Sequence, residues 1–541
     1  MIRRSVAASG ANTIGSCPTA AVSGRRTIEL CRPTLPRAAI LCANLLVVPT
    51  ASDLATLVRC AHRIHLDATG DPAERVPASD FLQFLWEEGR LHEEAVIAEM
   101  DVTSVSRGLP PPERVVETVR LMRQGAPSIY HGYLEHQGLR GEPDLLERVE
   151  VPSPLGSFSY LPVDVKSARA FEDEAGTRPK RRYLMQLCAY AELLEAHQGR
   201  RPVVGKIIDR DGATQSLDLA RAWPDYLAVR AQLQGILSGE EATRPGWKGA
   251  CAYCAWQDRC WEELVASDDL TTVAGLGEGT RQKLLPVGVT TATELAGADP
   301  GTLVAANGIG SKTAQTLTRQ AKAQKAGKPA LLAPWAPPAA EFDVSYDVED
   351  FAPGPFVYLH GLLIRNAGAR RFGEAGFTDA DWGSFEPVCA ELPETEEAVW
   401  QRFLERVRTL ERRGEYRVYV YSHHEKTMLK QLAETYGGSA ELNAFIDRFV
   451  DLLQVVRNHV VFPTDGRGLK ALARFIGFEW RDQDPGGAQS MAWWAEYEKD
   501  PAANRRLRDR IIAYNEDDLR ATFALRDWLE CFAAPSAPSL G

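Results

Sequence analysis

Residues 141–190 read GEPDLLERVEVPSPLGSFSYLPVDVKSARAFEDEAGTRPKRRYLMQLCAY, and this stretch decides the fold of the first half of the chain. Residues 160–165 form an apolar run that predicts a strand, and the two-residue repeat of a strand places Asp164 and Lys166 on the same face. Asp144 precedes them in a Gly-x-Pro-Asp turn. Two carboxylates beside one lysine can hold a divalent cation and orient a water molecule, which is the equipment that metal-assisted phosphodiester hydrolysis requires.

Two further motifs accompany these residues. Gln186 and Tyr190 are four positions apart, which places them on one face of the helix predicted for residues 182–197. Upstream, residues 89–93 read GRLHE and contain His92. In this order the four motifs resemble the PD-(D/E)xK nucleases of the RecB type, a family with a restriction-endonuclease-like α/β core.

The resemblance implies a role for each residue of the pattern. It implies Mg²⁺ or Mn²⁺ held by four groups, namely His92, Asp144, Asp164 and the carbonyl of Val165. Lys166 is implied to stabilise the attacking hydroxide or the charge of the phosphorane. Gln186 and Tyr190 are implied to position the nucleic-acid strand.

The composition limits the alternatives. With 541 residues the chain is too long for one hydrophobic core, so three or four domains are expected. The net charge of −11 excludes nucleic-acid binding by overall charge, and any such contact must be local. No apolar run reaches membrane-spanning length, so we expect no membrane partner.

Residues 1–50 differ from the rest, with six arginines and one acid. An organelle transit peptide, a start codon assigned too far upstream and a disordered leader all fit this composition, and we assign it no function. The predicted nuclease domain spans residues 51–265. It begins with a helix over residues 54–66, capped by Ser52 and Asp53.

Residues 247–260 read WKGACAYCAWQDRC and hold three of the ten cysteines, Cys251, Cys254 and Cys260. Zinc modules usually supply two local pairs, so this group needs a distant fourth ligand, and Cys60 inside the first predicted helix is the candidate. Closing so long a loop costs little more than closing a short one, since each doubling of its length adds about 0.6 kcal/mol. Four thiolates suit a cubane [4Fe–4S] cluster, and Zn²⁺ is the alternative.

The spacing of one plus three cysteines around a RecB-type core resembles the iron–sulfur nucleases, such as the AddB subunit and the CRISPR spacer-acquisition nucleases. The resemblance implies a structural cluster that pins the ends of the chain around the active site. The remaining cysteines are scattered singly, unlike those of a secreted disulfide framework, and this predicts a reducing, cytoplasmic location.

Residues 266–328 predict a small all-α module. Two short motifs, each before a predicted helix, contain Gly275, Gly277, Gly308, Gly310 and Lys312. They resemble a tandem helix-hairpin-helix module, whose hairpin N–H groups approach a DNA phosphate. Residues 301–328 contain five lysines or arginines and no acid, which supplies the local basic patch that an acidic chain requires. A purely structural helical linker is the alternative.

Residues 329–341 are predicted to be a Pro/Ala linker, and a second α/β domain is predicted for residues 342–533, with a tail at 534–541. Three strands of this second domain are predicted at residues 342–349, 356–364 and 417–421. In the first domain, a strand is predicted at residues 203–208 and a helix from Leu217 onward. Asp347 and Glu349 form an Asp-x-Glu pair on one side of their strand.

The second domain ends with Tyr514 and Asp518, four positions apart on a predicted helix. Together with the Asp-x-Glu pair, this resembles a ribonuclease-H-like, DEDD-type exonuclease domain of the YprB kind. The resemblance implies two metals held by Asp347, Glu349 and Asp518, with Tyr514 orienting the attacking water. The family has an aspartate after the third strand, and here Glu425 is the nearest acid to replace it as a ligand. Asp451 is a second candidate, more consistent with a structural role.

Together these features predict a multidomain α/β protein that resembles a bacterial RecB-like nuclease family and acts as a metal-dependent nuclease on DNA, single-stranded or with free ends, in repair or processing. The chain has no Gly-x4-Gly-Lys-Ser/Thr loop, so unwinding would need a separate helicase partner. Two alternatives stay open: an iron–sulfur scaffold that binds nucleic acid without cutting it, and a ribonuclease that acts on RNA through the C-terminal domain.

Overall fold

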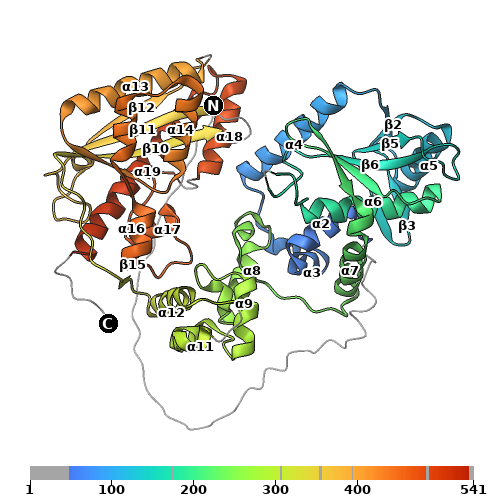
Figure 1. Ribbon diagram of the computed structural model, residues 1–541, viewed down its shortest axis with the longest axis horizontal. Coiled ribbons are helices and arrows are strands. Elements are labelled where there is room, and N and C mark those ends of the chain that lie inside the picture. Colours follow the sequence, from blue (N-terminus) through green and yellow to red (C-terminus); the bar gives the residue numbers. More distant parts are fainter. Residues whose placement is uncertain are drawn as a thin grey trace, which may run out of the picture. The chain divides into compact units, whose positions relative to one another are not determined.

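The computed structural model describes residues 48–173, 175–304, 308–351, 356–392, 394–482 and 486–534. Most of the predicted leader and of the predicted tail lies outside these residues. Three folded parts follow one another along the chain, and each is described by itself (Figure 1). Within the described part, no helix is both long and apolar enough to cross a membrane.

The first part contains a six-stranded mixed sheet with the order β1-β2-β5-β6-β7-β8. Its strands are β1 (Thr103–Ser104), β2 (Ser128–Tyr130), β5 (Leu145–Val149), β6 (Ser159–Val165), β7 (Val204–Ile208) and β8 (Thr214–Asp218). Strand β6 lies between β5, to which it is antiparallel, and β7, to which it is parallel. All of its residues are buried, as expected of a strand covered on both faces, and this explains the nearly continuous apolar run.

Helices α4 and α6 cover opposite faces of this sheet (Figure 1). The helices of the first part are α2 (Ala51–Arg59), α3 (Ala61–Thr69), α4 (Asp80–Ala98), α5 (Pro111–Gln124), α6 (Arg181–Gln198) and α7 (Leu219–Ser238), with a β3 (Leu134–His136) and β4 (Leu139–Gly141) hairpin. Tyr160 of β6 belongs to the core that α6 completes. Val163 and Val165 point to the opposite face, where Val96 of α4 packs. Asp164 therefore shares the α6 face with Tyr160.

The N-terminal helix differs from its prediction. A single helix over residues 54–66 is wrong, because the chain breaks into α2 and α3 at Cys60, an extended residue with φ −163° and ψ 108°. Thr50, not Ser52, is the N-cap: its hydroxyl accepts from the Asp53 N–H, and the Asp53 carboxylate accepts from the Thr50 N–H. Local helix propensity does not reveal such a break, because packing of the two halves on different neighbours decides it.

Two other elements were not predicted correctly. Leu217 does not begin a helix but lies in β8, which pairs antiparallel with β7, and α7 begins two residues later. The predicted Pro/Ala linker contains β9 (Ala330–Leu331), which pairs with β15 (Val460–Val461). Strand β8 pairs with the strand directly before it, whereas β9 has two residues and is specified by a distant partner, which local sequence patterns do not show.

The cysteine-bearing segment packs on α3. It consists of the 3-10 turn η2 (Gly249–Tyr253) and the helix α8 (Gln257–Ala266). The Trp256 indole N–H donates to Asp67 Oδ1 at 2.8 Å, and the Val76 N–H donates to the Ala255 carbonyl at 2.7 Å. Trp256 comes so close to Gly70 that a Cβ at that glycine would lie 2.6 Å from the indole ring. These contacts bring residues almost two hundred positions apart in sequence together.

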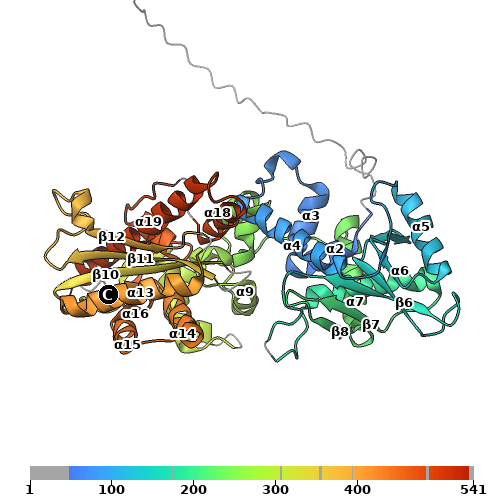
Figure 2. The same ribbon diagram turned by 90° about the horizontal axis from the view of Figure 1, so that it is seen from above.

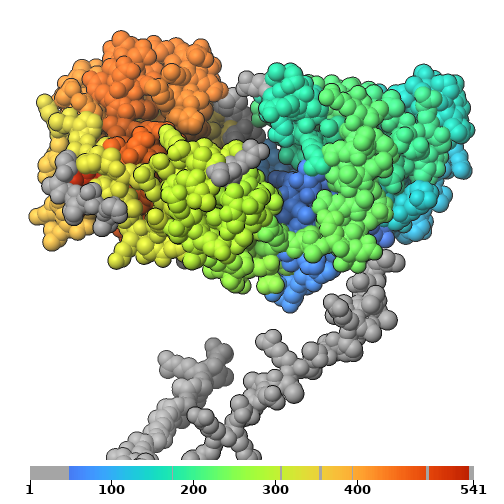
Figure 3. All heavy atoms as spheres, turned by 60° about the horizontal axis from the view of Figure 1, so that its bottom comes forward, coloured from blue at the N-terminus to red at the C-terminus, as the bar shows by residue number. Residues whose placement is uncertain are grey.

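The second part is a compact helical module, drawn in yellow-green in the space-filling view (Figure 3). It consists of η3 (Leu270–Thr272), α9 (Glu278–Leu284), η4 (Leu285–Val287), α10 (Ala292–Gly297), α11 (Pro300–Val304) and α12 (Ser311–Ala326). Gly275 and Gly308 have φ values of 84° and 81°, the left-handed region that glycine adopts without strain. Gly277 and Gly310 are the N-caps of α9 and α12. The two glycine motifs therefore form equivalent turns before a helix, as predicted.

The third part contains a five-stranded sheet with the order β12-β11-β10-β13-β14. Its strands are β10 (Phe342–Phe351), β11 (Phe356–Asn366), β12 (Ser384–Cys389), β13 (Tyr416–Val420) and β14 (Phe449–Asp451). Its helical elements are η5 (Asp379–Trp382), α13 (Glu396–Arg413), α14 (His424–Tyr436), α15 (Ala440–Asp447), α16 (Leu452–His459), α17 (Leu469–Phe475), α18 (Gly487–Lys499) and α19 (Arg505–Phe532). Strand β10 pairs antiparallel with β11 and parallel with β13.

Helices α13 and α19 cover opposite faces of this sheet (Figure 2). Val344 and Tyr346 of β10 belong to the core that Phe403 of α13 completes. The alternate residues of β10 point to α19, where the Asn515 amide donates to Asp347 Oδ2 at 2.8 Å. The alternation of β10 thus separates an aromatic core on one face from carboxylates on the other.

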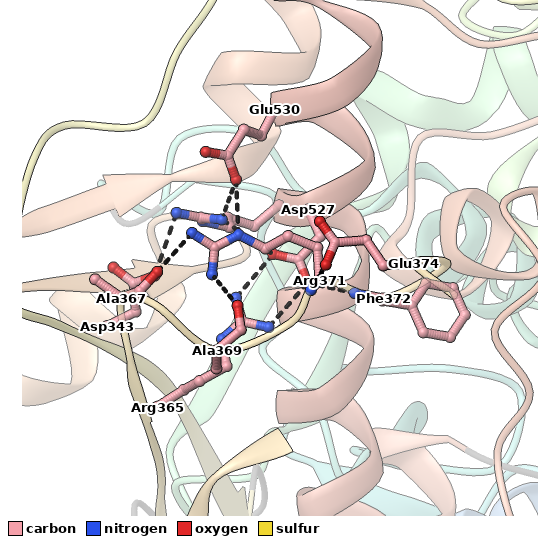
Figure 4. A network of polar contacts seen from close by, with 10 residues as sticks. Asp343, Arg365, Ala367, Ala369, Arg371, Phe372, Glu374, Asp527 and Glu530 are labelled. Atoms are coloured by element: carbon pink, nitrogen blue, oxygen red, sulfur yellow. Dashed lines mark hydrogen bonds and ion pairs between the residues drawn. The ribbon is translucent and has the colours of Figure 1, made fainter. Parts of the chain in front are cut away.

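A buried ion network ties α19 to the sheet (Figure 4). Arg365 of β11 donates two hydrogen bonds of 2.8 Å to Asp527 of α19, and both side chains are fully buried. Arg526 lies 3.2 Å from Asp343 of β10 and 3.0 Å from Asp527. Arg371 Nε lies 3.9 Å from Asp527 Oδ1. Such a pair needs both partners, because one charge left alone in the interior is strongly unfavourable.

Asp527→Ala should therefore lower the free energy of unfolding by about 3–5 kcal/mol, since it leaves Arg365 buried without a counter-ion. Arg408→Ala, which removes the exposed Arg408–Glu405 pair, should cost at most about 0.5 kcal/mol. Chemical denaturation of the two variants beside the unchanged protein measures both values. A loss below about 1 kcal/mol for Asp527→Ala would contradict the role given to the network.

Candidate active sites

The residues of the central motif come together at the end of β6. Lys166 Nζ lies 2.9 Å from Asp164 Oδ2 and 3.8 Å from Asp144 Oδ2. Asp144 is held in place by the Val165 N–H, which donates to its Oδ2 at 2.7 Å. Asp164 is almost completely buried, and apart from the lysine neither of its carboxylate oxygens has a hydrogen-bond partner among the described residues. Such unpartnered buried oxygens are suited to a cation.

The electrostatics of this group follow from burial and from its mixed charges. Burial, followed by the charge of Asp164, raises the pKa of Asp144 to about 8. Burial alone would lower the pKa of Lys166, but the charges of Asp164 and Asp144 hold it above its usual value. Lys166 therefore stays cationic, while Asp144 is half-protonated near pH 8 until another positive charge arrives.

Gln186 and Tyr190 of α6 lie beside this group. The Gln186 amide donates to the Tyr190 hydroxyl at 2.9 Å, and that hydroxyl donates to the Glu142 carbonyl at 3.2 Å. The Tyr190 ring leaves no room for a side chain at position 141, where a Cβ would lie 2.8 Å from it. Gly141 therefore allows α6 to place its motif directly against the turn that carries Asp144.

His92 does not join the two aspartates in this structure. Its Nε2 lies 3.1 Å from the Asp209 carbonyl, and the described residues contain no set of three ligand atoms around Asp144 and Asp164 within 4.8 Å of one another. Its ligand role stays a prediction. The neighbouring residue Glu93 accepts hydrogen bonds from Tyr130 at 2.9 Å and His131 at 3.1 Å, and its charge acts on Asp144. We did not predict Glu93 as part of the site, although it directly follows His92.

A second acidic group lies between β10 and α19. One carboxylate oxygen from each of Asp347, Glu349 and Asp518 lies within 4.8 Å of the other two. Within the described residues this is the only group of three or more potential metal ligands at that spacing. The structure therefore assembles the predicted Asp-x-Glu pair and the last aspartate, as two-metal chemistry needs.

Burial and mutual repulsion act on all three carboxylates. Burial, followed by the charge of Asp518, raises the pKa of Glu349 to about 8. The pKa values of Asp347 and Asp518 are also raised, in each case mainly by burial. Carboxyl groups in this state take up protons unless a cation neutralises them.

Neighbouring groups that we did not predict complete this site. The Asn515 amide bridges Asp347 and Glu349 with hydrogen bonds of 2.8 and 3.5 Å. A Cβ at position 361 would lie only 1.7 Å from Asn515 Oδ1, so only a glycine, Gly361, allows Asn515 to lie this close to the strand. The Trp480 indole N–H donates to Asp518 Oδ1 at 2.6 Å. No local motif marks Trp480, because it comes from a loop that only the tertiary fold brings here.

Glu425 and Asp451, the two candidates for the fourth acid, differ in their surroundings. Glu425 is buried in the first turn of α14, and its Oε2 has no partner among the described residues. Burial raises the pKa of Glu425 to about 7, and its charge acts on Asp347. Asp451 instead caps α16 by accepting from the N–H groups of Leu453 and Gln454. The structural role of Asp451 is thus the better supported one.

The four predicted cluster cysteines come close together. The pKa of Cys260 is raised to about 12, mainly by burial and then by Cys254, Cys60 and Cys251. No three of the four sulfur atoms lie within 4.8 Å of one another. A single tetrahedral zinc with Zn–S bonds of about 2.3 Å would need sulfur atoms about 3.8 Å apart, whereas a larger cluster spaces its ligands more widely.

The glycine turns of the helical module have exposed cations beside them. Lys312 is exposed in the first turn of α12, and Lys283 Nζ lies 3.3 Å from the Gly308 carbonyl. Arg319 and Lys322 are exposed further along α12. Lys325 is partly neutralised by an ion pair with Asp268. Asn307, which directly precedes Gly308, lies outside the described residues.

Family models match three stretches of the chain. Residues 72–261 match the PD-(D/E)XK nuclease superfamily, residues 267–323 a SAM-like helix-hairpin-helix tandem and residues 357–530 the RNase_H superfamily. The chain therefore carries these three domains in the predicted order, which confirms the predicted fold class. Two of the three are nuclease-type domains. No curated protein matched the chain.

The raised pKa of Asp144 predicts how stability depends on pH. Because the folded protein holds this proton up to about pH 8 and the unfolded chain releases it near pH 4, stability without metal should fall as pH rises between these values. As the pH rises from 6 to 8 in EDTA, Asp144→Asn, which cannot ionise, should gain about 2 kcal/mol of stability relative to the unchanged protein.

Denaturation with EDTA at several pH values checks this expectation. Asp225→Asn is the matched control, because the ion pair with Arg181 lowers the pKa of Asp225 and leaves it ionised throughout this range. Parallel pH profiles for Asp144→Asn and Asp225→Asn would contradict the pKa assigned to Asp144.

Proposed function

We propose that the protein is a metal-dependent nuclease of the RecB-like kind that hydrolyses phosphodiester bonds of DNA, single-stranded or with free ends, in repair or processing. The observation that carries the proposal is the Asp144–Asp164–Lys166 group, with Lys166 Nζ 2.9 Å from one carboxylate and 3.8 Å from the other. Bound Mg²⁺ or Mn²⁺ would supply Lewis-acid activation of the phosphate and of a water molecule.

The residues of the core domain divide this work. Asp144 and Asp164 would hold the cation, with the Val165 carbonyl and His92 as further ligands. Lys166 donates to the attacking oxygen or to the developing charge on the phosphate. Gln186 and Tyr190, already linked by a hydrogen bond, position the strand. The hairpin module, with Lys312 exposed at the start of α12, contacts the phosphates.

The three domains are proposed to occupy residues 51–265, 266–328 and 342–533, with residues 329–341 between the second and the third. A separate helicase would supply single strands, and the proposed location is the cytoplasm.

Lys166→Ala and Asp164→Ala should each reduce cleavage of labelled single-stranded DNA with Mn²⁺ at least about 100-fold, since each removes charge stabilisation at the phosphate. The measurement is an initial rate of product release in a background in which Asp347→Ala has removed the second acidic group. Lys206→Ala is the matched control, because Lys206 lies on the neighbouring strand and pairs with Glu147. Full activity in both core variants would place the chemistry elsewhere, and binding without cleavage would favour the scaffold alternative.

A second cleavage centre is the further candidate, supported by the spacing of Asp347, Glu349 and Asp518 within 4.8 Å. Tyr514 would orient the attacking water, and Glu425 would complete the acidic group. If this centre prefers RNA, cleavage of RNA that survives Lys166→Ala but not Asp518→Asn would identify the ribonuclease alternative.

We also propose that Cys60, Cys251, Cys254 and Cys260 hold one [4Fe–4S] cluster. The support for a shared site is that the charges of Cys254, Cys60 and Cys251 all act on Cys260. Such a cluster would join the α2–α3 break to the segment after the nuclease sheet.

Protein purified without oxygen should then be brown and contain about four irons and four sulfides per chain. Cys60→Ser should bleach the colour as completely as Cys254→Ser, although the two residues lie in different segments. Cys188→Ser should leave the colour intact, because Cys188 is fully buried in α6. Colourless protein with one zinc per chain would rule out the cluster and leave the nuclease proposal standing.

A further inference from the structure

One cation lies next to the acidic group of the RNase H-like domain. Lys470, near the start of α17, has its Nζ 2.9 Å from the Tyr514 hydroxyl and 4.9 Å from the centre of the Tyr514 ring. No carboxylate oxygen of the described residues lies within 4.0 Å of this ammonium, so it does not serve a structural salt bridge. The Lys470 ammonium instead contacts Tyr514, through a hydrogen bond to the hydroxyl and a cation–π contact with the ring.

The chemistry of the two groups fixes the direction of this hydrogen bond. An ammonium group has three N–H donors and no acceptor, so Lys470 donates and the Tyr514 oxygen accepts. The hydroxyl proton of Tyr514 must then point away from Lys470. A hydroxyl that accepts from a cation is also a stronger donor, because hydrogen bonds in a chain polarise one another.

The charge of Lys470 reaches the whole acidic group. It opposes the rise in the pKa of Asp347, of Glu349 and of Asp518. Because like charges repel, the same ammonium also weakens the attraction of the site for a divalent cation.

We propose that Lys470 is a positioning residue of the RNase H-like site: by donating to the Tyr514 oxygen it fixes the orientation of the hydroxyl that would hold the attacking water, at the cost of weaker cation binding. The effect on rate rests on the proposed second cleavage centre, whereas the effect on cation binding does not. Lys470 thus lowers the affinity of the site for the metal ion and fixes the orientation of the Tyr514 hydroxyl.

The test uses the full chain carrying Asp164→Ala, which silences the core site both for cleavage and for Mn²⁺ binding. The variants are Lys470→Met, Lys470→Arg, Tyr514→Phe and the Lys470→Met/Tyr514→Phe double change. Lys430→Met is the matched control, because Lys430 is exposed on α14 and lies outside the acidic group. Asp518→Asn identifies the part of the Mn²⁺ binding signal that belongs to this site.

Titration calorimetry with Mn²⁺ is the first readout. Lys470→Met should bind Mn²⁺ roughly three- to tenfold more tightly, because a repelling charge is removed, whereas Lys470→Arg and Lys430→Met should bind as the background protein does. A residue needed only for folding would weaken binding when removed. Unchanged or weaker binding by Lys470→Met overturns the proposal, even if the domain cleaves nothing.

Cleavage kinetics are the second readout. Lys470→Met should lower kcat about tenfold while Lys470→Arg restores most of it, and the double change should be no slower than Tyr514→Phe alone, since both single changes remove one interaction. Independent, multiplying effects of the two changes would overturn the link through Tyr514. If Asp518→Asn leaves the cleavage rate of the Asp164→Ala background unchanged, the RNase H-like domain contributes no activity and the proposed second cleavage centre fails. The Mn²⁺ titration alone then decides the role of Lys470.

Discussion

The close approach of α19 to β10 and β11 is the constraint on which the C-terminal domain depends. Gly361 has no side chain, so Asn515 can lie against the sheet and hold both carboxylates of the Asp-x-Glu pair. Three turns further along the same helix, the buried Arg365–Asp527 pair fixes the helix against β11. The helix therefore cannot shift along the sheet without breaking one of these contacts, and this sets where Tyr514 and Asp518 lie.

Both acidic sites follow the same physical rule. Each places carboxylates at the end or edge of a buried strand, where burial raises their pKa values and leaves them short of positive charge. In the core domain Lys166 supplies one positive charge directly, at 2.9 Å from Asp164. In the RNase H-like domain Lys470 contacts a tyrosine instead of a carboxylate. The two sites thus differ in how much of the negative charge the protein itself compensates.

The cysteine segment shows how tertiary packing brings distant residues to one place. Cys60 comes near the other three thiols because the chain breaks between α2 and α3, and because Trp256 anchors the segment to Asp67. A continuous helix, as the local pattern predicted, would have kept Cys60 on a helical surface. Packing overrode propensity at this position, as it often does where a helix meets two different neighbours.

The sequence by itself determined the order of the three domains, the alternation that puts Asp164 and Lys166 on one face, and the glycine turns of the hairpin module. These features depend on residue spacing within one element, which local geometry converts directly into a face or a turn. Only the tertiary structure decided that Glu93, Asn515, Trp480 and Lys470 lie at the sites, and that Asp451 caps a helix. Their positions depend on contacts between elements far apart in the chain, and no local period encodes such contacts.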